Sequence, residues 1–253
     1  MYPILLKFGP LTIYTYGLMV AIGCFVGFFY IKGEARRLAL DVDRVLSLFL
    51  WVLISGFLGG RLLYILVEWE RFLNEPLATI FARGGFVFYG GFILAFGISL
   101  WQARRKDLNI WKIADIFAPA VAVAYAIGRL GCFLNGCCYG RPTRSWLGVT
   151  FPPESPAGYL AQPLIPVQLF SSLSLFLIFL VLLYLRPHKK FDGQLFWLYV
   201  LLYGVSRFLI EIFRGDPRGN IWVFSTSQFI AIVFAILALV MLAKLGRMKR
   251  ESF

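Results

Sequence analysis

Charged side chains are scarce in this sequence. Only 15% of its 253 residues are Asp, Glu, Lys or Arg, and 60% are hydrophobic, whereas soluble domains carry about 25% charged residues. This shortage excludes an ordinary soluble domain and predicts a membrane protein. The net charge of +12 would otherwise suggest nucleic acid, but cations in membrane proteins chiefly set topology, so no nucleic-acid partner is expected.

The sequence also lacks linkers rich in Ser and Gly, low-complexity tracts and fixed-period repeats. We therefore expect one transmembrane domain over residues 1–253. Apolar runs of about 17–25 residues can cross a bilayer, and seven of them predict an all-α, polytopic integral membrane protein with seven transmembrane helices. The runs are 11–31, 45–67, 84–101, 112–131, 167–185, 194–213 and 223–243.

The connections between these runs predict an orientation. Four alternate segments, 32–44, 104–112, 186–190 and 244–250, hold four, four, three and four of the 25 Lys and Arg residues. The positive-inside rule places them in the cytoplasm, so the C terminus is expected inside and the N terminus outside. The connection 137–166 is too rich in proline for a continuous helix and predicts a small outward-facing cap.

Charged side chains lie in or at the ends of the apolar runs, and those singled out here are Arg61, Arg129, Arg207, Glu211 and Arg214. An arginine at the centre of a bilayer costs on the order of 2.5–3.5 kcal/mol, so such residues face the protein interior and usually mark a site. Counted along their helices at ~1.5 Å per residue, the first three arginines fall in the outer half of the membrane. They predict a functional site in that leaflet.

Two interpretations of these charges stay open. Glu211 lies four residues after Arg207 and three before Arg214, so the three can pair along one helix face. However, the runs contain few other carboxylates besides Asp115, and the planar guanidinium group suits a phosphate. We favour an anion site, and in the outer leaflet the simplest anion is a phospholipid headgroup.

Glycine-rich blocks surround the arginines. "SGFLGGR" (55–61), "GGFVFYGG" (84–91) and "GRLGCFLNGCCYG" (128–140) each combine glycines with polar or aromatic residues. Glycine lets helices approach closely and lets the backbone leave helical geometry. Such backbone is tolerated in a membrane where protein or a wet cavity covers it, which favours a crevice beside the arginines.

The last block resembles the signature of the prolipoprotein diacylglyceryl transferase family, whose usual form is G-R-x-G-N-F-x-N-x-E-x-x-G. The similarity extends in order over almost the whole chain. The other matching blocks are "YTYGLM" (14–19), "FLGGRLLY" (57–64), "GGFVFYGG" (84–91), "DIFAP" (115–119), "PVQLF" (166–170) and "SRFLIEIFRGDP" (206–217).

The resemblance implies an enzyme of the bacterial cytoplasmic (inner) membrane. It would transfer the sn-1,2-diacylglyceryl group of phosphatidylglycerol to the lipobox cysteine thiol in a prolipoprotein signal peptide, the first step of lipoprotein maturation. This reaction is expected to need no metal or other cofactor. An inactive relative that binds phospholipid or signal peptides, and a lipid transporter, are the alternatives.

The matching motifs also imply residue roles. Arg129 and Arg207 correspond to the family's phosphate-handling arginines and Tyr16 to its important tyrosine, so all three are expected to be catalytic. Further residues on family positions are expected to contact substrate, and they are Arg61, Asn135, Glu211, Arg214, Cys132 and Cys137.

The sequence departs from the family pattern at three of these places. Tyr89 stands where many members carry a histidine, Cys132 replaces the signature asparagine and Cys137 the signature glutamate. The one histidine, His188, lies in a basic inner segment, which excludes a histidine base. Tyr89 either orients or accepts the thiol proton, as a catalytic residue, or simply lines the lipid cavity.

The clustered cysteines leave three interpretations. Buried structural thiols are favoured, and a disulfide from Cys132 to Cys137 or Cys138 comes second, because the site faces an oxidising compartment. A metal site or covalent catalysis comes last. A structural zinc ion takes four N or S ligands, and three cysteines without a nearby histidine do not supply them.

Overall fold

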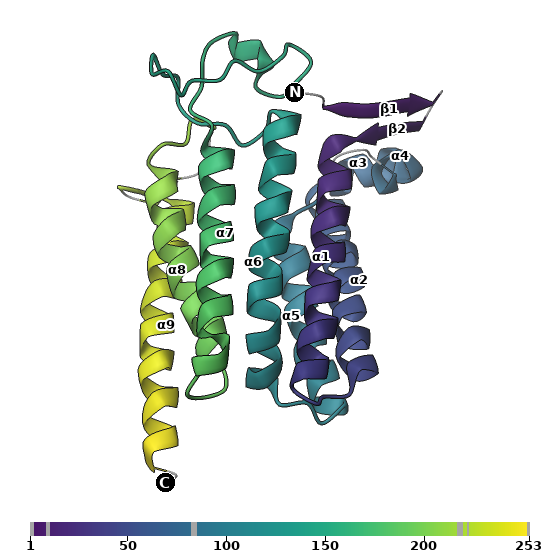
Figure 1. Ribbon diagram of the computed structural model, residues 1–253. Coiled ribbons are helices and arrows are strands. Elements are labelled where there is room, and N and C mark those ends of the chain that lie inside the picture. Colours follow the sequence, from purple (N-terminus) through teal and green to yellow (C-terminus); the bar gives the residue numbers. More distant parts are fainter. Residues whose placement is uncertain (1–2, 9–10, 82–84, 217–219, 222, 252–253) are drawn as a thin grey trace. The chain divides into compact units, whose positions relative to one another are not determined.

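The computed structural model describes residues 3–8, 11–81, 85–216, 220–221 and 223–251, and it is mostly helical (Figure 1). Among these residues, five helices are long and apolar enough to cross a membrane. They are α1 (Thr15–Arg37), α2 (Val42–Val67), α6 (Ile110–Asn135), α7 (Val167–Leu185, continued by the 3-10 turn η2, Arg186–His188) and α9 (Thr226–Glu251). The chain is thus a multi-pass helical membrane protein.

Two further helices occupy the remaining predicted spans. α5 (Phe88–Arg105) and α8 (Gln194–Glu211) have 18 residues each, which is about 27 Å of helix at 1.5 Å per residue. Gly84, with which the predicted span 84–101 begins, lies outside the described residues. The crossing of the bilayer by all seven helices stays a prediction.

Two small hairpins depart from the all-α prediction. β1 (Ile4–Phe8) pairs with β2 (Leu11–Tyr14), so the span predicted from residue 11 was wrong at its start, and the helix begins at Thr15. β3 (Asn220–Ile221) pairs with β4 (Phe224–Ser225) and delays the last helix to Thr226. Apolar runs contain no signal that separates a β-branched or aromatic strand from the helix that follows.

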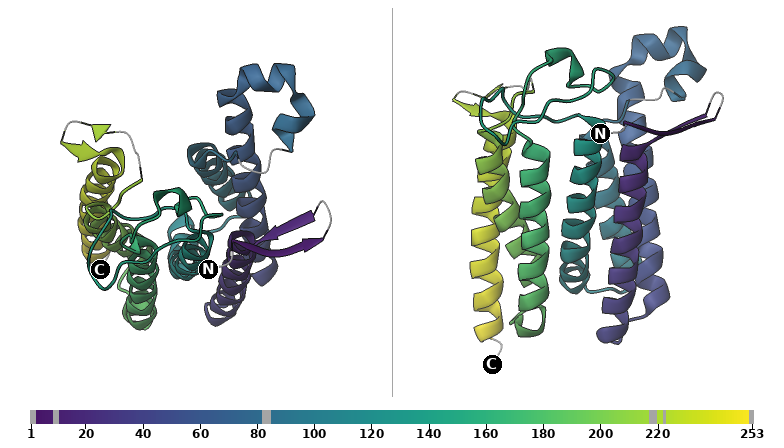
Figure 2. Two further views of the ribbon diagram at one scale, coloured as in Figure 1. Left: turned by 90° about the horizontal axis from the view of Figure 1, so that it is seen from above. Right: turned by 45° about the horizontal axis from the view of Figure 1, so that its top comes forward.

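The chain divides into two compact units, Met1–Tyr30 with Ala114–Phe253, and Ile31–Ile113. In the first, which we call the large unit, α6, α7 and α8 share a buried cluster formed by Ala118, Ala122, Ile178, Leu182 and Leu195. Helix α9 lies against α8 (Figure 2). Helix α1 packs on α6 through Gly23, where an added Cβ would lie 2.7 Å from the Ala124 carbonyl oxygen.

In the second, which we call the small unit, α2 and α5 pack closely, and the short helices α3 (Trp69–Asn74) and α4 (Pro76–Ile80) connect them. An added Cβ at Gly59 or Gly90 would lie 2.4 or 2.3 Å from the other glycine's carbonyl oxygen. Asp41 caps the N-terminus of α2, because its Oδ1 accepts the Arg44 N–H at 3.1 Å.

The segment 136–166 is largely non-helical and contains only the 3-10 turn η1 (Gly158–Leu160). It lies over one end of α6 and α7 (Figures 1 and 2). Its own small core holds Tyr139, Phe151, Ala157 and Leu164. A bridge between Gly140 and Arg214 fastens it to the chain just beyond α8, so this segment borders the C-terminal ends of both α6 and α8.

Candidate active site

Arg129 lies buried near the C-terminal end of α6, with 8% of its surface exposed. Its guanidinium carbon lies 4.8 Å from the centre of the Tyr125 ring, and its Nη2 donates to the Tyr125 hydroxyl. The two residues are four apart, so they share one helix face. Within the described residues, its Nε has no hydrogen-bond partner and no carboxylate pairs with it.

Arg207 and Arg214 share the carboxylate of Glu211. Arg207 Nη2 lies 2.7 Å from Glu211 Oε2, and Arg214 Nε lies 3.9 Å from the same oxygen. The predicted pairing along one helix face is therefore present for Arg207 and Glu211, whereas Arg214 approaches Glu211 from just beyond the end of α8. Ser227 Oγ accepts a further hydrogen bond from Arg207 Nη2 at 3.1 Å, whereas Arg207 Nη1 is buried without a partner among the described residues.

Arg214 has a second carboxylate that the sequence reasoning missed. Its Nε and Nη2 donate to the two oxygens of Asp216, each at 2.8 Å. This is the two-pronged geometry in which a guanidinium group binds a carboxylate most strongly. Arg214 is thus the best compensated cation of the group, and the two-residue spacing to Asp216 lies beyond the helix, where helical periodicity gives no signal.

The charges of this group do not cancel. Three guanidinium groups face two carboxylates, those of Glu211 and Asp216, which leaves one positive charge in excess at Arg129. A cavity of about 10 Å³ lies between Arg129 and Arg207, roughly the space of one water. The residues that line it are Arg129, Ser171, Ser174, Leu175, Tyr203, Ser206, Arg207 and Ile210.

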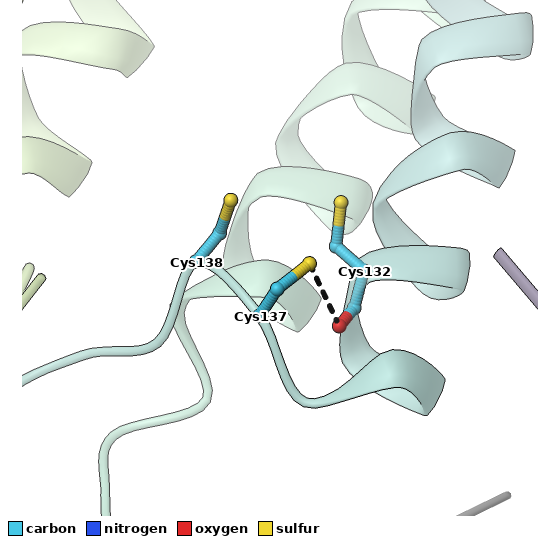
Figure 3. Close-up of side chains that lie close together, drawn as sticks. All are labelled: Cys132, Cys137 and Cys138. Atoms are coloured by element: carbon cyan, nitrogen blue, oxygen red, sulfur yellow. Dashed lines mark hydrogen bonds between the residues drawn. The ribbon is translucent and has the colours of Figure 1, made fainter. Parts of the chain in front are cut away.

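The three clustered cysteines lie together just beyond Arg129. The Sγ atoms of Cys132, Cys137 and Cys138 are all within 4.8 Å of one another, and Figure 3 shows them converging from the last turn of α6 and the loop that follows. All are free thiols. The two neighbouring thiols, and after them the charges of Arg129 and Arg214, hold the pKa of Cys138 below its ordinary value.

Two more predicted residues adjoin this cluster. Tyr16, the second residue of α1, lies near enough to Arg129 and to all three cysteines for electrostatic interaction. Asn135 interacts with the Cys137 sulfur through its side chain. Within the large unit, the structure therefore gathers Tyr16, Arg129, Cys132, Asn135, Cys137, Arg207, Glu211 and Arg214.

Arg61 belongs to the small unit, where backbone carbonyl groups accept hydrogen bonds from its guanidinium group. Nη1 donates to the Gly85 oxygen at 3.0 Å and Nη2 to the Thr79 oxygen at 2.7 Å, with a further bond from Nη2 to Ile80. The cation also lies 5.5 Å from the Phe86 ring centre. These contacts hold the end of α4 and the start of the next loop against α2.

Tyr89 also belongs to the small unit. It is the second residue of α5, it is half-exposed, at 52%, and its ring contacts that of Phe88 edge-on.

Two tyrosines beside Arg129 were not predicted from the sequence, Tyr125 and Tyr203. The Tyr203 hydroxyl donates to the Tyr125 hydroxyl at 3.4 Å. The four-residue spacing from Tyr125 to Arg129 was the available signal.

The helices and the buried guanidinium groups define a polytopic membrane protein with an interior cationic site. Comparison with known proteins gives the family. The family model described as prolipoprotein diacylglyceryl transferase matches residues 3–244. The chain belongs to this family.

Its curated relatives are similar along nearly their whole length. A phosphatidylglycerol–prolipoprotein diacylglyceryl transferase of Clostridium tetani is 37% identical, covering 99% of this chain and 100% of the relative. The protein of that name numbered 2 in Clostridium perfringens is 38% identical over 94% and 93%. One from Geobacter sulfurreducens is 34% identical over 98% and 96%.

Proposed function

We propose that this protein transfers the diacylglyceryl group of phosphatidylglycerol to the lipobox cysteine thiol of prolipoproteins. The observation that carries the proposal is the arginine pair: Arg129 and Arg207, like Arg214, each bury a guanidinium nitrogen that has no partner among the described residues, and these two arginines line one cavity. A buried, unsatisfied donor costs about 1–3 kcal/mol, and more when it is charged. A ligand that accepts both hydrogen bonds removes that cost.

The charge of the site suits this ligand. The phosphodiester of phosphatidylglycerol carries one negative charge, and the group of three arginines and two carboxylates has one positive charge in excess. The space between the arginines holds about one water, so the phosphate either displaces Tyr203 or binds on the side of the arginines away from it. The relatives' names specify the same lipid.

The reaction demands more of the leaving group than of the nucleophile. A cysteine thiol has a pKa of about 8.5, so its ionisation at pH 7 costs about 2 kcal/mol, a small part of the ~8–23 kcal/mol that enzymes typically supply. The larger barrier is charge on the departing glycerol phosphate. Arg129 and Arg207 are placed to stabilise that charge.

The other residues have supporting roles in the proposal. Tyr16 and Asn135 border the place where the thiol meets the lipid, and Glu211 and Arg214 hold Arg207 in position. These four side chains come from the large unit. Arg61 and Tyr89 belong to the small unit, and the roles proposed for them in lipid binding and in orientation of the thiol rest on their positions in the family motifs.

In the bacterial inner membrane, all seven long helices are proposed to cross the bilayer. The basic segments then lie in the cytoplasm with the C terminus, and the N terminus and the segment 136–166 lie outside. This orientation puts Arg129 and Arg207 in the outer-leaflet half, where signal peptides of exported proteins and phosphatidylglycerol are both available. Segment 136–166 covers the site and borders the exit for the water-soluble product.

The test is transfer of the diacylglyceryl group from labelled phosphatidylglycerol to a lipobox peptide by the purified protein. Arg129→Ala should lower the rate at least about 10²–10³-fold, as loss of a transition-state donor does, while membrane insertion is unchanged. The matched control is Arg144→Ala, because Arg144 is an exposed arginine. Wild-type protein that binds both substrates but transfers nothing would identify an inactive relative.

A further inference from the structure

The three thiols at the end of α6 form a compact triangle. Because no two Sγ atoms are more than 4.8 Å apart, a point exists within about 2.8 Å of all three, against a Zn–S bond of about 2.3 Å. Movements of about half an ångström therefore bring Cys132, Cys137 and Cys138 to bonding distance of one ion. Figure 3 shows the three side chains directed toward a common region.

The loop that carries these thiols is held in place by hydrogen bonds. The Cys137 N–H donates to the Cys132 oxygen at 3.1 Å, and the buried Gln168 of α7 donates to the Cys137 oxygen at 2.8 Å. Gly136 and Cys138 adopt left-handed backbone, with φ of 73° and 57°. For a non-glycine residue this conformation is uncommon.

We propose that Cys132, Cys137 and Cys138 bind a zinc ion whose fourth coordination position receives the lipobox cysteine thiol. A structural zinc site needs four protein ligands, and this cluster offers three. Zinc sites that act on a substrate, however, use three protein ligands and keep the fourth position open. Sulfur ligands select zinc over magnesium or calcium. This inference rests on the proposed transfer reaction and adds the group that activates its nucleophile.

The surrounding charges fit such a complex. Arg129 and Arg214 lie close enough to the cysteines for electrostatic interaction, and they would repel a bare divalent cation. Three thiolates with one Zn²⁺, however, carry a net charge of −1. The positive charge of Arg129 attracts that complex as well as the lipid phosphate, whereas the charge of Arg214 is already paired with Asp216 and Glu211.

Zinc would activate the substrate thiol without a histidine base. The chain has one histidine, His188, and it lies at the end of α7 opposite to the cysteines. A thiol that coordinates Zn²⁺ is deprotonated outright. Its proton leaves to water, and the sulfur lone pair then forms the C–S bond at the glycerol carbon. The C–O bond to the phosphate breaks, and the phosphate oxygen keeps that electron pair beside Arg129 and Arg207.

The first experiment measures metal in the purified full-length protein. We expect about one zinc per chain by elemental mass spectrometry, with loss of most of it in Cys132→Ser, Cys137→Ser and Cys138→Ser. Cys24→Ser is the matched control, because Cys24 is a free cysteine within α1. Cys137→His should keep one ion, which separates ligand loss from misfolding. A metal-free wild type that binds no zinc when it is added, or a disulfide within the cluster, overturns the proposal.

The second experiment tests the fourth position with cobalt in place of zinc. Thiolate-to-cobalt charge-transfer absorbance should appear, and it should rise by about one third when a lipobox peptide adds a fourth thiolate to the three of the protein. A peptide with serine in place of the lipobox cysteine should leave the spectrum unchanged. Equal spectra with the two peptides overturn substrate coordination.

Parallel transfer assays separate this inference from the proposed function. Chelation should abolish transfer, and zinc should restore it. Full transfer by demonstrably metal-free protein overturns the zinc inference and supports the proposed function. Zinc-loaded wild type that does not transfer overturns the proposed function, and with it the role of the ion in activating the thiol.

Discussion

At the scale of single residues, the arginines differ in how far their charges are compensated. Arg214 has Asp216 and Glu211, Arg207 shares Glu211, and Arg129 has an aromatic ring and a hydroxyl from Tyr125. Charge left uncompensated is charge available to a ligand. We therefore expect Arg129 to dominate phosphate binding, and Arg207 to act through its Nη1, which has no partner among the described residues, and through its position.

Replacing Glu211 with Gln tests the structural part of this arrangement. The substitution removes the carboxylate that Arg207 and Arg214 share, and breaking a buried pair costs about 3–5 kcal/mol. Denaturant unfolding of the detergent-solubilised protein, followed by tryptophan fluorescence, should show that loss. Glu154→Gln, at an exposed position, is the control. Equal midpoints for wild type and Glu211→Gln would contradict the pairing.

Tyr89 is tested by substitution with Phe, which removes only the hydroxyl group. If that group orients the thiol by one neutral hydrogen bond, worth about 0.5–1.5 kcal/mol, kcat/KM for the lipobox peptide should fall roughly two- to ten-fold. Binding of phosphatidylglycerol should stay the same. An unchanged kcat/KM leaves Tyr89 as an aromatic residue of the lipid-binding surface.

At the scale of elements, Asp115 of α6 fixes the start of α8. Its Oδ1 accepts the Phe196 N–H at 3.0 Å, and its Oδ2 accepts the Gly193 N–H at 2.9 Å. Lys189 pairs with the same carboxylate at 3.0 Å. These contacts set the position of α8 along α6, and with it the position of Arg207 relative to Arg129 at the far end of the helices.

Lys189 allows a matched comparison of two carboxylates, because it pairs with the buried Asp115 and, at 2.8 Å, with the partly exposed Asp192. Asp115→Ala should lower the free energy of unfolding by about 3–5 kcal/mol, and Asp192→Ala by about 0–1 kcal/mol. Denaturant unfolding checks both. Equal losses of unfolding free energy in the two variants would refute the role of burial at the start of α8.

The same lysine gives a pH dependence. Burial lowers the pKa of Lys189, but Asp192 and Asp115 together raise it above its ordinary value. The stability from this pair is therefore complete below the unfolded pKa of about 10.4 and is lost as pH rises through the folded pKa. The difference in free energy of unfolding between wild type and Asp115→Ala should therefore stay constant from pH 7 to 9 and become smaller above about pH 10.4. Denaturant unfolding at each pH measures it.

At the scale of the whole molecule, the proposed orientation can be tested by labelling from outside the cell. A cysteine at Arg144 should react with a membrane-impermeant maleimide in intact cells, because segment 136–166 is proposed to lie outside. A cysteine at Lys190 should react only after the membrane is opened. Both positions are exposed, so a difference in labelling shows on which side of the membrane each residue lies. The reverse pattern would invert the topology.

Hydropathy predicted much of the fold, because each membrane helix must contain a long apolar run. It missed both hairpins, since strands such as Leu11–Tyr14 continue the same run. For the site, the cost of charge in the membrane indicated Arg129, Arg207 and Arg214 as candidates. The spacing along the chain predicted that Arg207 and Arg214 pair with Glu211. Asp216 was missed because it pairs outside the helix.

The sequence by itself determined that the protein is a helical membrane protein of this family, since composition, helix periodicity and ordered motifs are local properties of the chain. Only the tertiary structure decided which arginine lacks a carboxylate, and that three cysteine sulfurs meet. Whether a carboxylate reaches Arg129 depends on how segments far apart in sequence pack around it, and among the described residues none pairs with it. The thiols are close in sequence, but their meeting depends on the path of the loop after α6, which hydrogen bonds from Cys137 and Gln168 hold in place.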